Sequence, residues 1–237
     1  MSHPKITIVT VVYNAVETIE ATISSVLSQT YRNIEYIIID GESSDGTLEI
    51  IKKYSNELSL WVSEKDKGIY DAMNKALGMA TGDWLLFLGA DDLLYSTNTI
   101  ENISGKFKSG GILYYGNTYL KQSNIKYNGK TNKWRLAYGN ISHQAIFYPK
   151  NMYKNNLYDL NYPIFADHVY NIKLYGLYAD KFSYIEDIIS IYNEQGVSST
   201  NNDKHYAEEI NSIINKHLGM SVNLYAQCRR MMASFLR

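Results

Sequence analysis

The sequence predicts an α/β fold in which a mostly parallel central sheet is flanked by helices. Over residues 5–95, apolar β-branched runs alternate four times with amphipathic segments, about 25 residues per unit, as in successive β-α-β crossovers. Polar or acidic residues follow three of these runs, at Tyr13-Asn14, Asp40 and Asp91-Asp92. Because the carboxyl ends of parallel strands share one edge of a sheet, these residues are expected to meet in one crevice.

The first half of the chain supplies these elements in order. Strands are predicted at 5–13, 34–39, 58–62 and 84–88, and helices at 15–28, 47–54 and 70–80. Asn14 followed by Glu17 is a capping-box pattern, which predicts that the first helix begins at Ala15. Asp71 and Lys75 lie one turn apart on the third helix, at a spacing that allows an ion pair.

The second half departs from this alternation. A weak helix is predicted at 96–108, strands at 112–116, 145–148 and 185–192, and helices at 166–175, 204–217 and 222–235. Asn128-Gly129 predicts the turn of an antiparallel hairpin. An apolar stripe on the last helix lies beside several arginines; the stripe is Tyr225, Cys228, Met232 and Phe235, and the arginines are Arg229, Arg230 and Arg237. Such a stripe either packs on its own domain or rests on a membrane surface, and the sequence leaves both open.

Composition narrows the class of protein. The chain has 237 residues, of which 45% are hydrophobic and 20% charged, as expected of a globular protein. A net charge of −1 gives no support to a nucleic-acid partner. The single Cys228 excludes an internal disulfide and a cysteine metal cluster. No leader precedes the first strand and no apolar run approaches the roughly 20 residues of a membrane span, so a cytoplasmic protein is expected.

The adjacent carboxylates Asp91 and Asp92 are the strongest chemical signal. They follow the short, fully apolar run 84–88, which suits a strand buried on both faces of a parallel sheet. Two carboxylates at such a strand end form a hard oxygen site for Mn²⁺ or Mg²⁺, and these ions usually hold phosphates. From the pair alone, a helix cap or a solvated turn explains them equally well.

Four motifs share their order and spacing with a known family. They lie at 10–14, 40–47, 66–75 and 80–84, the last leading to Asp91-Asp92. Together they resemble the family 2 glycosyltransferases with the GT-A fold, in particular the bacterial branch that builds colanic acid, capsules and O-antigens. The resemblance is strong over 5–95 and thinner at His143-Gln144, at 165–167 and at 196–198.

The resemblance implies an inverting glycosyltransferase of bacterial surface polysaccharide synthesis. The expected donor is a UDP-sugar carrying a hexose or N-acetylhexosamine, although a dTDP- or GDP-sugar stays open. The expected acceptor is a hydroxyl of a saccharide linked to polyprenyl diphosphate, and peripheral contact with the cytoplasmic face of the inner membrane follows from it. The family's architecture divides the chain into a nucleotide-sugar half at 1–110, an acceptor half at 111–203 and a C-terminal helical extension at 204–237.

The resemblance also assigns roles to individual residues. Asp167 would be the catalytic base, Asp92 would bind Mn²⁺ or Mg²⁺, and Asp40 would hydrogen-bond the uracil. Nucleotide-binding positions are Val12, Tyr13, Asn14, Asp40, Lys67, Asp71, Asn74 and Asp91, and acceptor or diphosphate contacts are His143, Gln144 and His168. A carboxylate near the acceptor hydroxyl can take its proton as the new bond forms.

Two positions depart from the family's pattern. His168 stands where the family often has Tyr, so it is a rival or a helper of the base. Ala90 stands where the three-residue acidic form of the metal motif has a carboxylate. The metal is therefore expected to rest on one side chain, the diphosphate and water, with a histidine as a further candidate ligand. Glu186 and Asp187 are reserve candidates for the base.

Two other classes of protein fit the sequence less well than a glycosyltransferase does. A nucleotidyltransferase would need a glycine-rich, basic phosphate loop directly after the first strand, and residues 14–18 contain neither Gly nor a basic residue. A non-catalytic sugar-binding module would account for the 22 tyrosines but not for the carboxylates at the strand ends.

Overall fold

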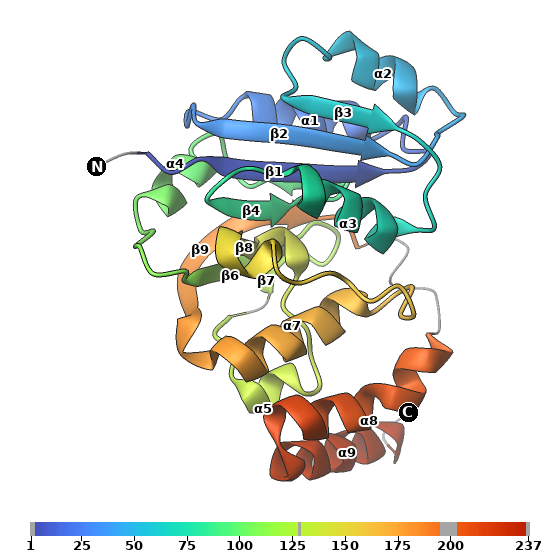
Figure 1. Ribbon diagram of the computed structural model, residues 1–237, viewed down its shortest axis with the longest axis vertical. Helices are drawn as coiled ribbons and strands as arrows, with labels where there is room; N and C mark the ends of the chain where they lie inside the picture. The colour runs from blue at the N-terminus through green and yellow to red at the C-terminus, as the bar shows by residue number, and fades with distance from the viewer. Residues whose placement is uncertain (1–2, 128, 195–202, 236–237) are drawn as a thin grey trace.

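A single mixed sheet runs through the whole protein and carries helices on both faces (Figure 1). The structure is a computed structural model that describes residues 3–127, 129–194 and 203–235. The sheet has nine strands in the order β3-β2-β1-β4-β8-β6-β9-β5, with β7 paired to β6. This arrangement confirms the predicted α/β class.

The first half contains the parallel part of the sheet. Its strands are β1 (Ile6–Val12), β2 (Ile34–Asp40), β3 (Leu60–Ser63) and β4 (Trp84–Phe87), and its helices are α1 (Ile19–Leu27), α2 (Thr47–Lys53) and α3 (Ile69–Met79). β1 lies between β2 and β4 and is parallel to both. All seven residues of β1 are buried, as expected of a central parallel strand.

The side chains of the central strands alternate between two cores. Val9 and Ile37 belong to a core that α3 and the C-terminal helices cover. Ile8 and Ile38 belong to the core on the opposite face, which α1 covers. This period of two fixes the register of the sheet, because a shift by one residue would turn every side chain to the wrong face.

The second half continues the same sheet in mixed orientation. Its strands are β5 (Leu93–Leu94), β6 (Leu113–Leu120), β7 (Ile125–Tyr127), β8 (Ile146–Pro149) and β9 (Phe182–Tyr192). Its helices are α4 (Thr99–Ser104), α5 (Lys133–Leu136), α6 (Lys150–Tyr153), α7 (Ala166–Tyr178), α8 (Lys204–Leu218) and α9 (Met220–Phe235), with short 3₁₀ turns at His143–Ala145 and Ala179–Lys181. β8 pairs antiparallel with β4, which joins the two halves.

A buried carboxylate network closes the edge of the sheet where β1 and β2 begin. The Glu35 carboxylate accepts hydrogen bonds from Lys5 Nζ (2.8 Å), Thr7 Oγ1 (2.6 Å) and both the backbone and the hydroxyl of Thr81 (2.7 and 2.6 Å). Burial alone would raise the pKa of Glu35, but these donors hold it at about 2, below its ordinary 4.5. The network ties the turn before β4 to the two neighbouring strands.

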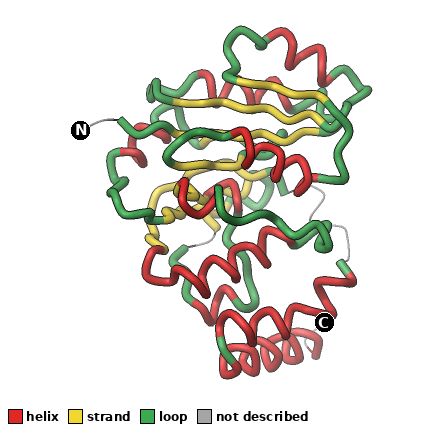
Figure 2. The backbone as a smooth tube through the Cα atoms, in the orientation of Figure 1, coloured by secondary structure: helices red, strands yellow, loops and turns green. Residues whose placement is uncertain are grey.

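Helices α7, α8 and α9 form a layer at the opposite end of the molecule from β3 (Figures 1 and 2). α8 packs closely on α7, because a Cβ on Gly176 would lie 2.7 Å from the backbone oxygen of His217. In α9 the inward side chains are Val222 and Ala226. The predicted stripe is not the packed face: Tyr225 and Met232 are 37% and 63% exposed, and Cys228 is also exposed.

Two local predictions are wrong in their details. α1 begins at Ile19 and has no side-chain cap, because Asn14 adopts a left-handed conformation (φ 49°) and its Oδ1 accepts from the backbone N–H of Ser44 instead. The hairpin between β6 and β7 turns at residues 121–124, with Asn124 at φ 57°. Gly129 lies beyond that hairpin, and residue 128 is outside the described residues.

Candidate active site

The polar residues after β1, β2 and β4 lie along one edge of the sheet, as predicted. Val12 is paired with Asp40 across β1 and β2, and Leu88 N donates to Val9 O (2.9 Å) just beyond β4. Asp91 and Asp92 come after β4, which is parallel to β1, so they lie at the same end of the sheet as Asp40. Neighbouring strands are about 4.8 Å apart, so the ends of β2 and β4 lie within roughly 10 Å of each other.

Asp91 and Asp92 form an acidic cradle over Gly89. A Cβ on Gly89 would lie 2.6 Å from Asp92 Oδ2 and 3.2 Å from Asp91 Oδ1, so these two oxygens converge above a residue that has no side chain. The other oxygens are held by Asn193 from the end of β9: its backbone N–H donates to Asp92 Oδ1 (2.9 Å) and its amide to Asp91 Oδ2 (3.1 Å).

The acidic cradle suits a divalent cation. Burial and the neighbouring charge of Asp91 raise the pKa of Asp92 to about 7, from its ordinary 3.8, so the bare carboxylates repel each other there. A cation would remove that repulsion, and carboxylate oxygens are the ligands that Mn²⁺ and Mg²⁺ prefer. No group of three or more His, Cys, Asp or Glu side chains that could hold a metal ion is found among the described residues.

Asp167 lies at the start of α7, almost fully buried. Its Oδ2 accepts from Asn140 Nδ2 (2.8 Å) and lies 3.4 Å from His143 Nδ1. Its Oδ1 lies 3.1 Å from the Tyr70 hydroxyl and accepts from the backbone of His168 (2.8 Å). These donors come from three separate parts of the chain and fix the direction of the carboxylate.

His143 connects this carboxylate to the acidic cradle. Burial alone would lower the pKa of His143, but the hydrogen bond and charge of Asp167, with smaller contributions from Asp92 and Asp91, raise it. In return, although burial favours its neutral form, the hydrogen bond and charge of His143 hold the pKa of Asp167 below its ordinary value. Asp167 is therefore ionised at neutral pH and can accept a proton.

The Asp40 side chain is turned into the protein rather than outward from the edge of the sheet. It is fully buried, and its carboxylate accepts from the hydroxyls of Ser43 (2.5 Å) and Ser63 (2.6 Å) and from Ser43 N (3.2 Å). These donors all come from the protein itself, and a contact between Asp40 and a uracil stays a prediction. Asp40 instead holds the loop after β2 against β3.

Asp66, rather than Asp40, lies beside Gly41 and the ring of Tyr13. Its Oδ2 lies 2.5 Å from the point where a Cβ on Gly41 would stand, and the ring of Tyr13 lies 3.4 Å from the same point. Its Oδ1 accepts from Gly68 N (2.8 Å). Tyr13 is 66% exposed, so a flat ring and a carboxylate face the solvent side by side. The sequence carried a signal for Asp66, since it follows the third strand as Asp40 follows the second.

The other predicted nucleotide residues of β1 and α3 have mainly structural partners. Val12 O accepts from Gly41 N (2.9 Å), and Asn14 N donates to Ser43 Oγ (2.8 Å), which orders the loops around the cleft. Asp71 Oδ2 accepts from the backbone N–H of Lys67 (3.0 Å), whose side chain is exposed.

Asn74 and His168 are both satisfied inside the protein. Asn74 exchanges two hydrogen bonds with the backbone of Tyr158 (2.9 and 2.8 Å). His168 Nε2 donates to Leu136 O (2.6 Å) and its Nδ1 accepts from the Tyr206 hydroxyl (2.6 Å). Burial lowers the pKa of His168, in keeping with a neutral ring. Both ring nitrogens of His168 are thus occupied by partners within the protein.

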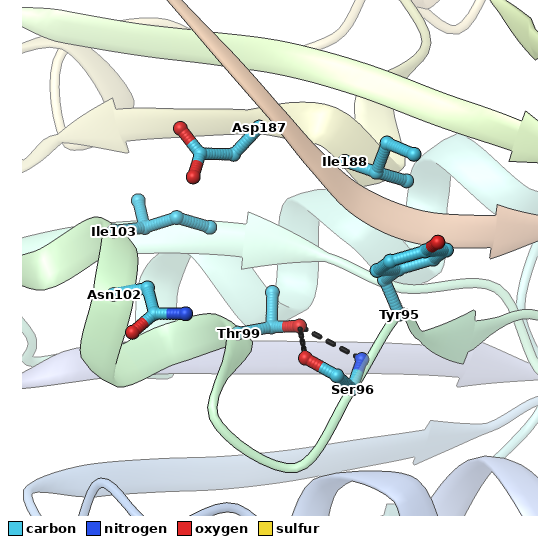
Figure 3. Close-up of a pocket in the computed structure, with 7 residues that line it drawn as sticks. All are labelled: Tyr95, Ser96, Thr99, Asn102, Ile103, Asp187 and Ile188. Atoms are coloured by element: carbon cyan, nitrogen blue, oxygen red, sulfur yellow. Dashed lines mark hydrogen bonds between the residues drawn. The ribbon is translucent and has the colours of Figure 1, made fainter.

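The remaining candidates are Gln144, Glu186 and Asp187, and none of them contacts Asp167 directly among the hydrogen bonds and ion pairs of the described residues. Gln144 is buried beside His143. Asp187 pairs with Lys106, and the side chain of Glu186 is 87% exposed. Figure 3 shows Asp187 in a pocket of about 230 Å³ between α4, β5 and β9, together with Tyr95 and Ser96. Apart from the reserve candidate Asp187, none of the residues that line this pocket belongs to the predicted site. The motif at 196–198 lies outside the described residues.

Comparison with protein families places the chain in a known group. The family model described as "Glycosyl transferase family 2" matches residues 7–175, more than half of the chain. A "PGL/p-HBAD biosynthesis glycosyltransferase" of Mycobacterium tuberculosis is 32% identical over 219 residues, covering 89% of this chain and 85% of that protein. The Escherichia coli "UDP-Glc:alpha-D-GlcNAc-diphosphoundecaprenol beta-1,3-glucosyltransferase WfgD" is 37% identical over 113 residues, 47% of this chain and 45% of WfgD.

Solved structures share the fold. Staphylococcus aureus TarS 1-349 in complex with UDP has a TM-score of 0.72 at 19% identity, over 90% of this chain and 65% of that one. Glucosyl-3-phosphoglycerate synthase from M. tuberculosis, in complex with Mn²⁺, UDP and phosphoglyceric acid, has a TM-score of 0.63 at 15% identity, over 92% and 79%. These similarities confirm the GT-A-like fold.

Proposed function

The chain belongs to glycosyl transferase family 2 and is a glycosyltransferase, and from this premise we propose that it transfers a hexose or N-acetylhexosamine from a UDP-sugar to a hydroxyl of a lipid-linked saccharide, with inversion. The route fits the synthesis of a bacterial surface polysaccharide on the cytoplasmic side of a membrane. One observation carries the proposal: His143 lies 3.4 Å from Asp167, and the charges of Asp92 and Asp91 as well as that of Asp167 raise its pKa, so the acidic cradle and the proposed base lie within electrostatic reach of one side chain.

The acidic cradle is the proposed diphosphate side of the cleft. Asp91 and Asp92 would hold Mn²⁺ or Mg²⁺, whose charge would offset the negative charge that develops on the departing diphosphate. Asn193 keeps the two carboxylates turned toward Gly89. The Mn²⁺ in the M. tuberculosis synthase structure supports the choice of cation.

Asp167 is the proposed base. An ionised carboxylate that is already held by Asn140 and His143 needs no reorientation to accept the proton of an acceptor hydroxyl. If the hydroxyl attacks from the side of Asp167 while the diphosphate leaves toward the acidic cradle, the displacement is direct and the anomeric centre inverts. An α-linked donor then yields a β-linkage.

Tyr13 and Asp66 are the proposed contacts for the base of the nucleotide. A uracil has a flat face, which can stack on the Tyr13 ring, and an N–H that a carboxylate such as Asp66 can accept. The UDP complex of TarS supports a uridine nucleotide. WfgD is named for its action on a diphosphoundecaprenol-linked sugar, which supports a lipid-linked acceptor.

A thermal-shift panel of nucleotide sugars with and without Mn²⁺ tests the proposal. We expect a stabilising shift with a UDP-sugar that requires Mn²⁺ and is lost in Asp92→Ala. Asp167→Asn should keep that shift yet lose transfer to an acceptor, because it keeps the shape but not the proton acceptor. A metal-dependent shift with only a dTDP- or GDP-sugar would replace the donor, and no shift with any of them would contradict the proposal.

A further inference from the structure

The outward face of α9 is apolar, although it is exposed. Met220, Leu224, Met231 and Met232 are 68%, 55%, 55% and 63% exposed. Met220, Leu224 and Met231 lie on the side opposite the buried Val222 and Ala226, and Met232 lies at the flank, so α9 is apolar on its exposed side as well as on its buried side. The sixteen residues of α9 make this face about 24 Å long.

Aromatic side chains from α5 and from the turn that follows it lie beside this surface. Trp134 and Tyr138 are 38% and 41% exposed, and both rings contact that of Tyr225 (centroids 5.4 and 6.2 Å apart). Figure 1 shows α5 beside α9 at the end of the molecule away from β3. We call the combined surface the α5–α9 face; it comprises Trp134, Tyr138, Leu224, Tyr225, Met231 and Met232.

Every charged side chain on α5 and α9 is basic. Arg229 lies over the ring of Tyr138 (4.2 Å) and Lys133 near that of Trp134 (5.5 Å). Neither α5 nor α9 contains an acidic residue. On the neighbouring α8, Glu208 pairs with Lys204, and Glu209 accepts from the hydroxyl of Tyr162. Exposed apolar side chains with Trp, Tyr and basic residues at the rim are typical of helices that lie in an anionic membrane interface.

The α5–α9 face is continuous with the acceptor side of the cleft. Leu136, the last residue of α5, accepts a hydrogen bond from His168, and Asn140 a few residues later donates to Asp167. Arg230 of α9 donates to Ala137 O (3.4 Å) in the same segment. A surface seated on this face would thus lie next to the chain segment that holds the base.

We propose that the α5–α9 face docks the enzyme on an anionic lipid bilayer. Docking is peripheral, since no helix in the described part of the chain is long and apolar enough to cross a membrane. The proposal rests on the proposed function in one respect: a lipid-linked acceptor would reach the cleft from that bilayer. Binding to the bilayer itself does not depend on the acceptor, so it can be tested separately.

The single cysteine offers a direct measurement on the full chain. Cys228 is exposed on α9, one turn from both Leu224 and Met232. A polarity-sensitive fluorophore attached to Cys228 should shift its emission to the blue when phosphatidylglycerol-containing vesicles are added. Vesicles of phosphatidylcholine alone, or phosphatidylglycerol vesicles in 1 M salt, should give a much weaker shift, because the attraction is partly electrostatic. No shift with anionic vesicles would overturn the proposal.

A matched pair of variants tests the face itself. Leu224→Glu and Leu157→Glu make the same change at residues that are 55% and 65% exposed, so neither should disturb folding. In flotation with anionic vesicles, Leu224→Glu should bind about fivefold more weakly or worse, and Leu157→Glu as the wild type. Equal loss in both variants would overturn the proposal. So would concentration-dependent self-association that only Leu224→Glu removes, since the face would then join two copies.

Activity separates this proposal from the proposed function. With a short-chain, water-soluble acceptor analogue, Leu224→Glu should transfer sugar at the wild-type rate, whereas with acceptor embedded in vesicles its rate should fall with its binding. Vesicle binding without transfer to either acceptor would support docking and count against the proposed function. Loss of rate with the soluble acceptor would place Leu224 in the reaction and overturn a docking role.

Discussion

Gly89 determines how closely the carboxylates of the acidic cradle can approach a ligand. A methyl group there would stand 2.6 Å from Asp92 Oδ2 and 3.2 Å from Asp91 Oδ1, in the space that a cation would use. We expect Gly89→Ala to fold normally but to lose the Mn²⁺-dependent thermal shift with donor. Gly78→Ala is the control, because a Cβ at Gly78 meets nothing within 4 Å. Retention of the shift in Gly89→Ala would place the cation elsewhere.

Tyr70 contacts the proposed base, Asp167, from the first turn of α3. Its hydroxyl lies 2.7 Å from Ile164 O and 3.1 Å from Asp167 Oδ1, and its contact helps to keep the pKa of Asp167 low. Tyr70→Phe should therefore lower kcat by roughly tenfold, the value of one hydrogen bond to a charged group. It should leave donor binding unchanged and move the acid limb of the pH–rate profile upward.

Tyr170→Phe is the matched control for this variant. The Tyr170 hydroxyl is also buried, and it has no hydrogen-bond partner among the described residues. Removing it should leave both kcat and the pH–rate profile in place. If both variants lost activity equally, Tyr70 and Tyr170 would contribute only by packing, and Tyr70 would not position Asp167.

At the residue scale, the sequence predicts which strand ends carry acids but not where their side chains point. Asp40 and Asp66 each follow a strand, yet Asp40 turns inward to Ser43 and Ser63 while Asp66 turns toward Tyr13. That choice depends on loop conformations set by distant partners. The same is true of His168, whose two ring nitrogens are bound by α5 and α8, elements far away in the sequence.

At the level of elements, the Glu35 network makes the start of β1 and β2 sensitive to acid. The folded pKa of about 2 lies below the ordinary 4.5, so the carboxylate stabilises the fold fully above about pH 4.5 and loses this contribution as pH falls toward 2. We expect Glu35→Gln to be less stable at pH 7 and to show a flatter decline between pH 4.5 and 2.5 in urea unfolding. An exposed control, Glu17→Gln, should follow the wild type; a steep decline in Glu35→Gln would assign acid sensitivity to other groups.

Element types were predicted more accurately than element boundaries. The apolar runs that form β1, β2 and β4 are buried on both faces, and nothing competes with that pattern. Asn14 did not cap a helix, because the serine-rich loop after β2 captures both its backbone and its side chain. A tertiary contact outweighed the local capping pattern there. The residues near Asn14 in the sequence do not predict this contact.

At the scale of the whole molecule, the C-terminal helices are linked to the proposed catalytic base, Asp167, through their packing on α7. α8 approaches α7 at Gly176, and Tyr206 of α8 donates to His168, the neighbour of Asp167. Gly176→Ala would force a Cβ against the His217 backbone, only 2.7 Å away. We expect a Tm lower by about 5 °C and slower transfer with donor binding retained. Gly105→Ala, whose Cβ would meet only ordinary contacts, is the control.

The pairing of β4 with β8 has a consequence for how substrates enter and products leave. Trp84 and Leu85 of β4 pair with Pro149 and Tyr148 of β8. The strand that precedes the acidic cradle therefore belongs to the same sheet as the half that contains Asp167. A hinge motion that opened the two halves would break backbone hydrogen bonds between buried strands. Turnover must instead rely on small rearrangements of surface loops around a rigid floor, and the halves should not fold when expressed as separate fragments.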